Sequence, residues 1–215
     1  VIAHGIFSWV PEAAREKILA ICGAQLSEAG IAYISYNALP GWNMRRSLRD
    51  MMLYHTRNLP DPAMKVQQSL ALLTFLSESV AGENSAYALH LKMELEFMRT
   101  QLVSYVQHDI LGQENTPFYF HEFIARADQH GLQYLGESGL AEMLASNFPE
   151  KVRNTLAQLG NDVIRQEQYM DFLRNRTFRQ TLLCRKGAAI RRNVGIADMK
   201  RFAFRSLLRP PETAV

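Results

Sequence analysis

The sequence has few of the residues that reinforce a protein in place of a hydrophobic core. Only two cysteines occur among 215 residues, Cys22 and Cys184, and no C-x-x-C spacing is present. This scarcity argues against a disulfide framework and against structural zinc. Both cysteines lie in apolar contexts, so we expect them to be buried and inert in a cytoplasmic protein. With 47% hydrophobic residues, the chain is long enough to bury a core without such cross-links.

Several functional signatures are also missing. The apolar runs fall far short of the ~20 residues needed to cross a bilayer, so we expect no membrane-spanning helix. The chain has neither a G-x-G-x-x-G motif nor a P-loop, and no serine lies in a G-x-S-x-G context. The pairs His108-Asp109 and His121-Glu122 are adjacent residues, which point about 100° apart on a helix. We therefore predict no metal site and assign no catalytic residue.

Charge is unevenly distributed along the chain. The formal net charge is +3, but residues 1–175 contain fourteen bases and nineteen acids, whereas residues 176–209 contain ten bases and one acid, Asp198. Such a basic segment is typical of a solvated helix face, or of a surface for an acidic protein, a membrane or nucleic acid. Few aromatic residues interleave with these bases, and in the distal part of the segment they are Phe202 and Phe204. Because nucleic-acid binding usually uses aromatic stacking platforms, we do not expect nucleic acid as a partner.

The hydrophobic pattern predicts an α/β protein rich in helix. The apolar run 1–3 and the β-branched and aromatic run 31–36 are expected to be strands. Between them a helix begins near Pro11 and stops at Gly30. A strand, a helix and a strand in this order predict a parallel pair. The other elements expected for the sheet region are a helix at 122–129 and strands at 132–135 and 177–184.

Between residues 43 and 111 the pattern is helical only. Apolar residues three and four positions apart predict helices at 43–56, 62–80 and 85–110, and Leu102 continues the apolar stripe of the last one. A second helical stretch is expected at 141–173, with breaks near Pro149 and Gly160. We therefore predict a strand-bearing segment at 1–42, a large helical insertion at 43–112, a return to the sheet at 113–186 with a second helical insertion near 140–175, and a basic tail or linker at 187–215.

Two short segments follow the expected ends of the first two strands. Residues 4–9 and 37–42 each combine a glycine, a tryptophan and a polar side chain. Ligands of open α/β sheets bind beyond the carboxyl ends of the strands, and this mixture suits a planar ligand held by a few hydrogen bonds. The alternative is that Trp9 and Trp42 simply seal the top of the sheet.

Longer stretches of the sequence resemble bacterial class I S-adenosylmethionine (SAM) dependent methyltransferases that carry a methyltransferase regulatory domain. The rickettsial protein-lysine methyltransferases look like relatives. The matching stretches are residues 2–11, 33–42, 49–55, 118–123, 130–135 and 175–184. The resemblance implies the C-terminal half of a Rossmann-like methyltransferase sheet, with strands four to seven, the last of them antiparallel. It also implies that residues 43–112 form a regulatory insertion, in which relatives place dimer contacts or a substrate cavity.

The resemblance further implies a cofactor, a substrate class and a set of site residues. The cofactor would be SAM, and the reaction would be methyl transfer to protein lysine in a homodimer. Because the family's glycine-rich loop and ribose-binding acid are absent, we expect only a longer parent protein to bind SAM. The alternative is an interaction or dimerisation module that binds no SAM. The implied cofactor-binding residues are His4, Gly5, Ser8 and Trp9, and the implied substrate-binding residues are Asn37, Pro40, Gly41, Trp42, Tyr119 and His121.

Overall fold

The computed structural model describes residues 1–160, 162–192, 195, 200, 203 and 205. Most of the predicted basic tail at 187–215 lies outside the described residues. Within them, no helix is both long enough and apolar enough to cross a membrane.

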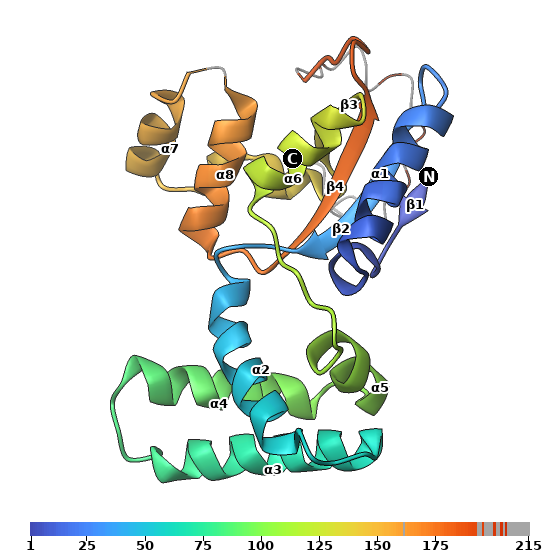
Figure 1. Ribbon diagram of the computed structural model, residues 1–215. Coiled ribbons are helices and arrows are strands. Elements are labelled where there is room, and N and C mark those ends of the chain that lie inside the picture. Colours follow the sequence, from blue (N-terminus) through green and yellow to red (C-terminus); the bar gives the residue numbers. More distant parts are fainter. Residues whose placement is uncertain (161, 193–194, 196–199, 201–202, 204, 206–215) are drawn as a thin grey trace.

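A mixed four-stranded sheet with the strand order β1-β2-β4-β3 forms one half of the molecule, at the top of Figure 1. β1 (Ile2–Ala3) and β2 (Ala32–Asn37) are parallel and are joined by α1 (Glu12–Gln25), as the sequence predicts. β4 (Phe178–Arg185) lies between β2 and β3 (Leu132–Glu137) and is antiparallel to both. These pairings confirm the predicted helix-rich α/β class and the antiparallel last strand.

Two helices, α1 and α6 (Phe120–Gln129), cover one face of this sheet. Between them the Tyr36 and Phe123 rings stack with centroids 4.1 Å apart, and Phe7 meets Phe123 edge-on at 5.3 Å. Cys22 is fully buried in the same core, and burial raises the pKa of its thiol. Gly23 permits the close approach of the two helices, because a Cβ there would lie 2.0 Å from the His130 carbonyl oxygen.

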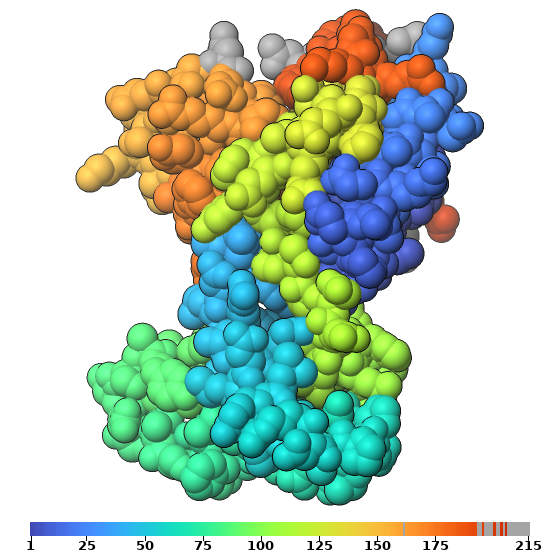
Figure 2. All heavy atoms as spheres, viewed as in Figure 1, coloured from blue at the N-terminus to red at the C-terminus, as the bar shows by residue number. Residues whose placement is uncertain are grey.

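A helical block forms the other half of the molecule. Figure 2 shows a narrower waist between it and the sheet half. Leu48, Met52, Leu73 and Leu91 are fully buried inside it. Its elements are α2 (Trp42–Thr56), α3 (Pro62–Ser79), α4 (Ala86–Arg99), the short α5 (Val103–Tyr105) and a five-residue π-helix, η2 (Val106–Ile110).

The prediction of one continuous helix over 85–110 is wrong in its middle. α4 ends at Arg99, and Leu102, expected in the apolar stripe, is 77% exposed. The side chains of Thr100 and Gln101 both donate to the Phe97 carbonyl, at 2.7 and 3.3 Å. Side-chain bonds of this kind compete with the helical backbone pattern and favour a break. The chain then re-enters helical geometry in α5 and η2 at a new angle.

The second helical stretch packs beside α6. Residues 140–147 form two short 3-10 turns, η3 (Leu140–Met143) and η4 (Ala145–Asn147), where we expected α-helix. α7 (Glu150–Ala157) and α8 (Val163–Arg174) follow, and the breaks fall at Pro149 and Gly160 as predicted. Gly160 has a φ of +72°, a backbone conformation that glycine adopts without strain.

A closed ion cluster, absent from our sequence predictions, fastens α8 to the sheet. Its centre is the fully buried guanidinium of Arg179, which donates to both oxygens of Asp171 at 2.8 Å. The same guanidinium donates to Glu137 at 2.6 Å and to Glu167 at 3.0 Å, and its central carbon lies 3.9 Å from the centroid of the Phe120 ring. We call Arg179, Asp171, Glu137 and Glu167 the Arg179 cluster.

Candidate functional site

A hollow of about 500 Å³ lies where the carboxyl ends of β1 and β2 meet the helical block. We call it the junction hollow. Its lining on the sheet side is His4, Gly5, Trp9, Asn37, Thr177 and Phe178. Its lining on the side of the helical block is Trp42, Arg45, Phe97, Tyr105 and Asp109. The position agrees with the rule that ligands of α/β sheets bind beyond the strand ends.

The structure brings together half of the residues singled out from the sequence. His4, Gly5 and Trp9 follow β1, whereas Asn37 ends β2 and Trp42 begins α2. The backbone of Gly5 has a φ of +63°, and a Cβ there would meet nothing within 4 Å, so the chain presents an open backbone beside the hollow. Trp9 is half-buried and Trp42 is buried. The two tryptophans therefore lie at the carboxyl ends of β1 and β2, facing the helical block, and form walls of the hollow.

Ser8, Pro40 and Gly41 do not line the hollow, and two of them have clear packing roles. The fully buried Ser8 hydroxyl accepts the Asn37 backbone N–H at 2.9 Å. The N–H of Gly41 donates to the Arg176 carbonyl at 3.0 Å. A Cβ at Gly41 would lie 2.1 Å from the Asn175 carbonyl oxygen, so the close contact between these two turns requires glycine.

Tyr119 and His121 lie elsewhere, at the beginning of α6. Their rings stack with centroids 5.7 Å apart, and Nδ1 of His121 is 2.9 Å from the Gln168 side-chain oxygen. These contacts join α6 to α8. Neither residue lines the junction hollow.

The side chain of His4 has a defined orientation at the end of β1. Its Nδ1 lies 3.0 Å from the Tyr33 hydroxyl and 3.1 Å from the Ser35 hydroxyl. The Ser35 hydroxyl also accepts the Gly5 backbone N–H at 2.9 Å. The His4 ring meets the Phe178 ring edge-on, with centroids 6.4 Å apart. The strand β2 thus positions the imidazole through two hydroxyl groups.

A chain of hydrogen bonds fixes Asp109 relative to the strand ends. Its backbone carbonyl accepts the indole N–H of Trp9 at 3.1 Å and the side-chain amide N–H of Asn115 at 2.8 Å. The side-chain oxygen of Asn115 in turn accepts from Asn37 at 3.3 Å. Asp109 belongs to the π-helix η2, and π-helical turns inside helices are frequent at functional sites. Both strand ends therefore hold this turn of the helical block in place.

The net charge of the lining is set by Arg45 and Asp109. Arg45 is bound to Glu94 by two bonds of 2.7 and 2.9 Å, and its guanidinium lies 4.3 Å from the centroid of the Phe97 ring. Among the described residues, no base lies within ion-pair distance of the Asp109 carboxylate. Partial burial raises the pKa of this carboxyl group, and the nearby charge of His108 opposes that shift. Of these two side chains, Asp109 is thus the one that has no ion-pair partner among the described residues.

Of the wall that the helical block contributes, only Trp42 was singled out from the sequence. Arg45, Phe97 and Tyr105 were assigned to amphipathic helices with no site role, and Asp109 was considered only as a metal ligand. No sequence signal marks the break at 100–102 that turns η2 toward the sheet.

The described residues contain no group of three or more His, Cys, Asp or Glu side chains placed to hold a metal ion.

The residues of the junction hollow fit one part of SAM but not all of it. The exposed backbone at Gly5 and the surrounding aromatic rings could accommodate the methyl-donating end of SAM and the side chain that accepts the methyl group. The lining has one carboxylate, Asp109, and it comes from the helical block. The chain has no glycine-rich phosphate- or nucleoside-binding motif. These residues therefore do not form a complete cradle for the cofactor.

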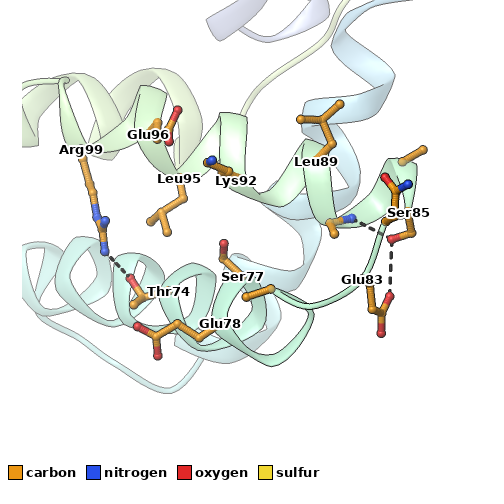
Figure 3. Close-up of a pocket in the computed structure, with 14 residues that line it drawn as sticks. Thr74, Ser77, Glu78, Glu83, Ser85, Leu89, Lys92, Leu95, Glu96 and Arg99 are labelled. Atoms are coloured by element: carbon orange, nitrogen blue, oxygen red, sulfur yellow. Dashed lines mark hydrogen bonds between the residues drawn. The ribbon is translucent and has the colours of Figure 1, made fainter.

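A second hollow, of about 650 Å³, lies between α3 and α4, far from the strand ends (Figure 3). Arg99 donates to the Thr74 hydroxyl across it at 3.2 Å, and Ser85 caps α4 at its other end. Lys92 and Arg99 share the lining with Glu78 and Glu96, so charges of both signs are present. We assign no site to this groove.

The fold and the junction hollow define an α/β protein with a candidate ligand site at the carboxyl ends of parallel strands, completed by helices. Residues 103–185 match the family model described as a predicted methyltransferase regulatory domain. This part of the chain is therefore similar to a methyltransferase regulatory domain, as the resemblance implied. The match includes η2, α6, α8 and the strands β3 and β4.

Two relatives extend the similarity to nearly the whole chain. PKMT2 from Rickettsia typhi, in a structure with AdoHcy, superposes with a TM-score of 0.82 at 40% identity over 93% of this chain. The uncharacterized protein RP789 of Rickettsia prowazekii is 46% identical over 202 residues, or 94% of this chain. A third protein, sll1526 of Synechocystis, is also uncharacterized and is 29% identical over 192 residues, or 88% of this chain. The chain spans only 36% of RP789, 38% of PKMT2 and 38% of sll1526.

Proposed function

We propose that this chain provides the acceptor side of a SAM-dependent methyltransferase that modifies lysine in a protein, in the cytoplasm. The observation that carries the proposal is the junction hollow at the carboxyl ends of β1 and β2, in a fold shared with PKMT2 at a TM-score of 0.82. Methyl transfer depends above all on alignment of the reacting atoms. His4, Trp9 and Trp42 orient the acceptor and exclude water, and a further part of the parent protein holds the nucleoside of SAM.

The helical block supports a second candidate, a module that binds a partner or a second copy of the chain and needs no SAM. Several large apolar side chains on the block are exposed: Phe75 by 65%, Met93 by 60% and Leu89 by 59%. In the methyltransferase proposal the same surface provides dimer contacts within the insertion at 43–112. The two candidates differ in whether the junction hollow takes part in chemistry.

A chimaera of two proteins separates the candidates. This chain replaces the matched 38% of R. typhi PKMT2, and transfer of labelled methyl groups to a lysine-containing protein substrate of PKMT2 is measured. The first proposal predicts methylation above that of PKMT2 lacking the segment. A folded chimaera that binds AdoHcy calorimetrically but transfers no methyl group would favour the interaction module.

Light scattering on a sizing column tests the module directly. The interaction module predicts a stable oligomer of the isolated chain that dissociates when Phe75 is replaced by Glu. A monomer at high concentration would contradict a role in self-association, whereas the chimaera result would stand unaffected.

A further inference from the structure

The junction hollow is lined by aromatic rings from both halves of the molecule and by one acidic residue, Asp109. Trp9 and Phe178 contribute from the sheet half, and Trp42, Phe97 and Tyr105 contribute from the helical block. An aromatic ring attracts a cation to its face, with an effect that grows as the site is desolvated. Rings together with a carboxylate select a positively charged and partly apolar group over a neutral or anionic one.

One cation–π interaction is already present in the wall of the hollow, formed by Arg45. The Arg45 guanidinium lies over the Phe97 ring at 4.3 Å and over the Trp42 ring at 5.2 Å. Glu94 neutralises that charge through its two bonds, and the Arg45 and Glu94 side chains are only 12% and 14% exposed. Arg45 is therefore a paired part of the wall and does not compensate the charge of Asp109.

The backbone carbonyl of Asp109 is hydrogen-bonded, whereas its carboxylate forms no ion pair with any base among the described residues. Trp9 and Asn115 bind its carbonyl oxygen, so the position of the residue depends on the strand ends and not on a partner of the carboxylate. We propose that the junction hollow binds a cationic side chain such as an alkylammonium group, held between the aromatic walls and the Asp109 carboxylate.

This inference rests on the proposed function and adds a task for the helical block. The block contributes the counter-charge and three of the rings, so it forms one wall of the acceptor site besides any regulatory or dimer role. Asp109 acts as a specificity-determining residue, because it favours binding of a charged lysine side chain over neutral side chains of similar shape. The bound ammonium releases its proton to solvent before the neutral amine attacks the methyl group.

Intrinsic fluorescence provides the test, because the only two tryptophans of the sequence, Trp9 and Trp42, both line the hollow. The chain is titrated with n-butylammonium, with n-butanol as a neutral analogue and with butyrate as an anion. We expect a saturable change for the ammonium at concentrations at least about tenfold lower than for either analogue. Equal responses to the three compounds, or tighter binding of butyrate, would overturn the inference.

Variants tie the response to the proposed residues. Asp109→Asn should weaken binding of n-butylammonium about fivefold to tenfold, and Phe178→Leu should weaken it by a smaller factor. The matched control is Asp128→Asn, which removes a carboxylate that pairs with Lys186 at the surface and should leave the affinity unchanged. An unchanged affinity in folded Asp109→Asn would rule out the role of Asp109.

The fluorescence titration and the methylation assay of the chimaera can fail independently of each other. Selective binding of the ammonium together with an inactive chimaera would reject the methyltransferase proposal and retain the cation site. An active chimaera without selective binding would reject the cation site alone.

Discussion

The Arg179 cluster and the junction hollow both place charges beside aromatic rings, but only the cluster is closed. The guanidinium of Arg179 is fully buried and donates to three carboxylates, whereas Asp109 is partly exposed and has no base within ion-pair distance among the described residues. A closed set of paired charges fixes the arrangement of α8 on the sheet. A carboxylate without a paired base, beside an open hollow, leaves room for a charged ligand. The two regions should therefore respond in opposite ways to substitution, one in stability and the other in binding.

The largest effect on stability is expected for Arg179→Met. Removal of the guanidinium takes the shared cation from three buried carboxylates, of which Asp171 keeps an ion pair with Arg176 at 2.7 Å. Loss of one partner of a buried ion pair costs roughly 3–5 kcal/mol. Urea unfolding monitored by circular dichroism measures this loss. The control is Lys186→Met, which breaks a surface pair with Asp128 and should change the unfolding free energy by less than ~1 kcal/mol. Similar values for the two variants would remove the distinction between closed and exposed pairs.

A smaller loss of stability is expected for Asn115→Ala. This variant removes the hydrogen bonds that connect Asn37 to the Asp109 carbonyl. Two hydrogen bonds disappear in a partly buried place, so the unfolding free energy should fall by about 1–2 kcal/mol. Asn147→Ala is the matched control, because it removes one exposed bond to the Ala141 carbonyl. If Asn115→Ala unfolds like this control, the link does not hold the two halves together.

Sequence alone predicted much of the sheet half but little of what distinguishes these two regions. All four strands were placed from apolar and β-branched runs, because strand patterns are local. The Arg179 cluster escaped detection because Arg179 sits in an alternating strand pattern, where nothing marks an inward-facing base. About half of the lining of the junction hollow was not predicted, because its contacts join residues far apart in the sequence, such as Trp9 and Asp109, 100 residues apart. The position of η2 beside the strand ends also follows from the break after α4, which depends on side-chain hydrogen bonds of Thr100 and Gln101.

The pH dependence of stability should distinguish two glutamates of the sheet half. Burial raises the pKa of Glu167 despite its bond to Arg179, a cation that it shares with two other carboxylates. The contribution of Glu167 to the free energy of unfolding is fully present below the pKa of the group in the unfolded chain, near 4.5. This contribution is lost as the pH rises through the higher pKa of the folded state. The advantage of the wild type over Glu167→Gln should therefore shrink as the pH rises above about 4.5.

The contribution of Glu12 to stability should depend on pH in the opposite direction. Hydrogen bonds from Arg126 and Arg15 lower its pKa, so its contribution is present above 4.5 and is lost as the pH falls through the folded value. Because this side chain is 53% exposed, the effect in Glu12→Gln should be small. Parallel pH profiles of the two variants, measured by thermal unfolding, would contradict the difference in environment.

The smallest effect on stability is expected for Asp109→Asn. Its carboxylate has no ion pair to lose among the described contacts, so the unfolding free energy should change by less than ~0.5 kcal/mol. Urea unfolding of this variant beside Arg179→Met gives the sharpest contrast between the two regions. A loss comparable to that of Arg179→Met would mean that Asp109 is structural.

The most direct test of the open site is a proton NMR spectrum of butyltrimethylammonium with the chain. Methyl protons held over aromatic faces experience ring currents, so a cation enclosed by the walls of the junction hollow should show an upfield shift of its N-methyl signal that saturates. The shift should be much smaller at the same concentrations with Asp109→Asn. An unshifted signal with the wild-type chain, or an equal shift with the variant, would contradict the account.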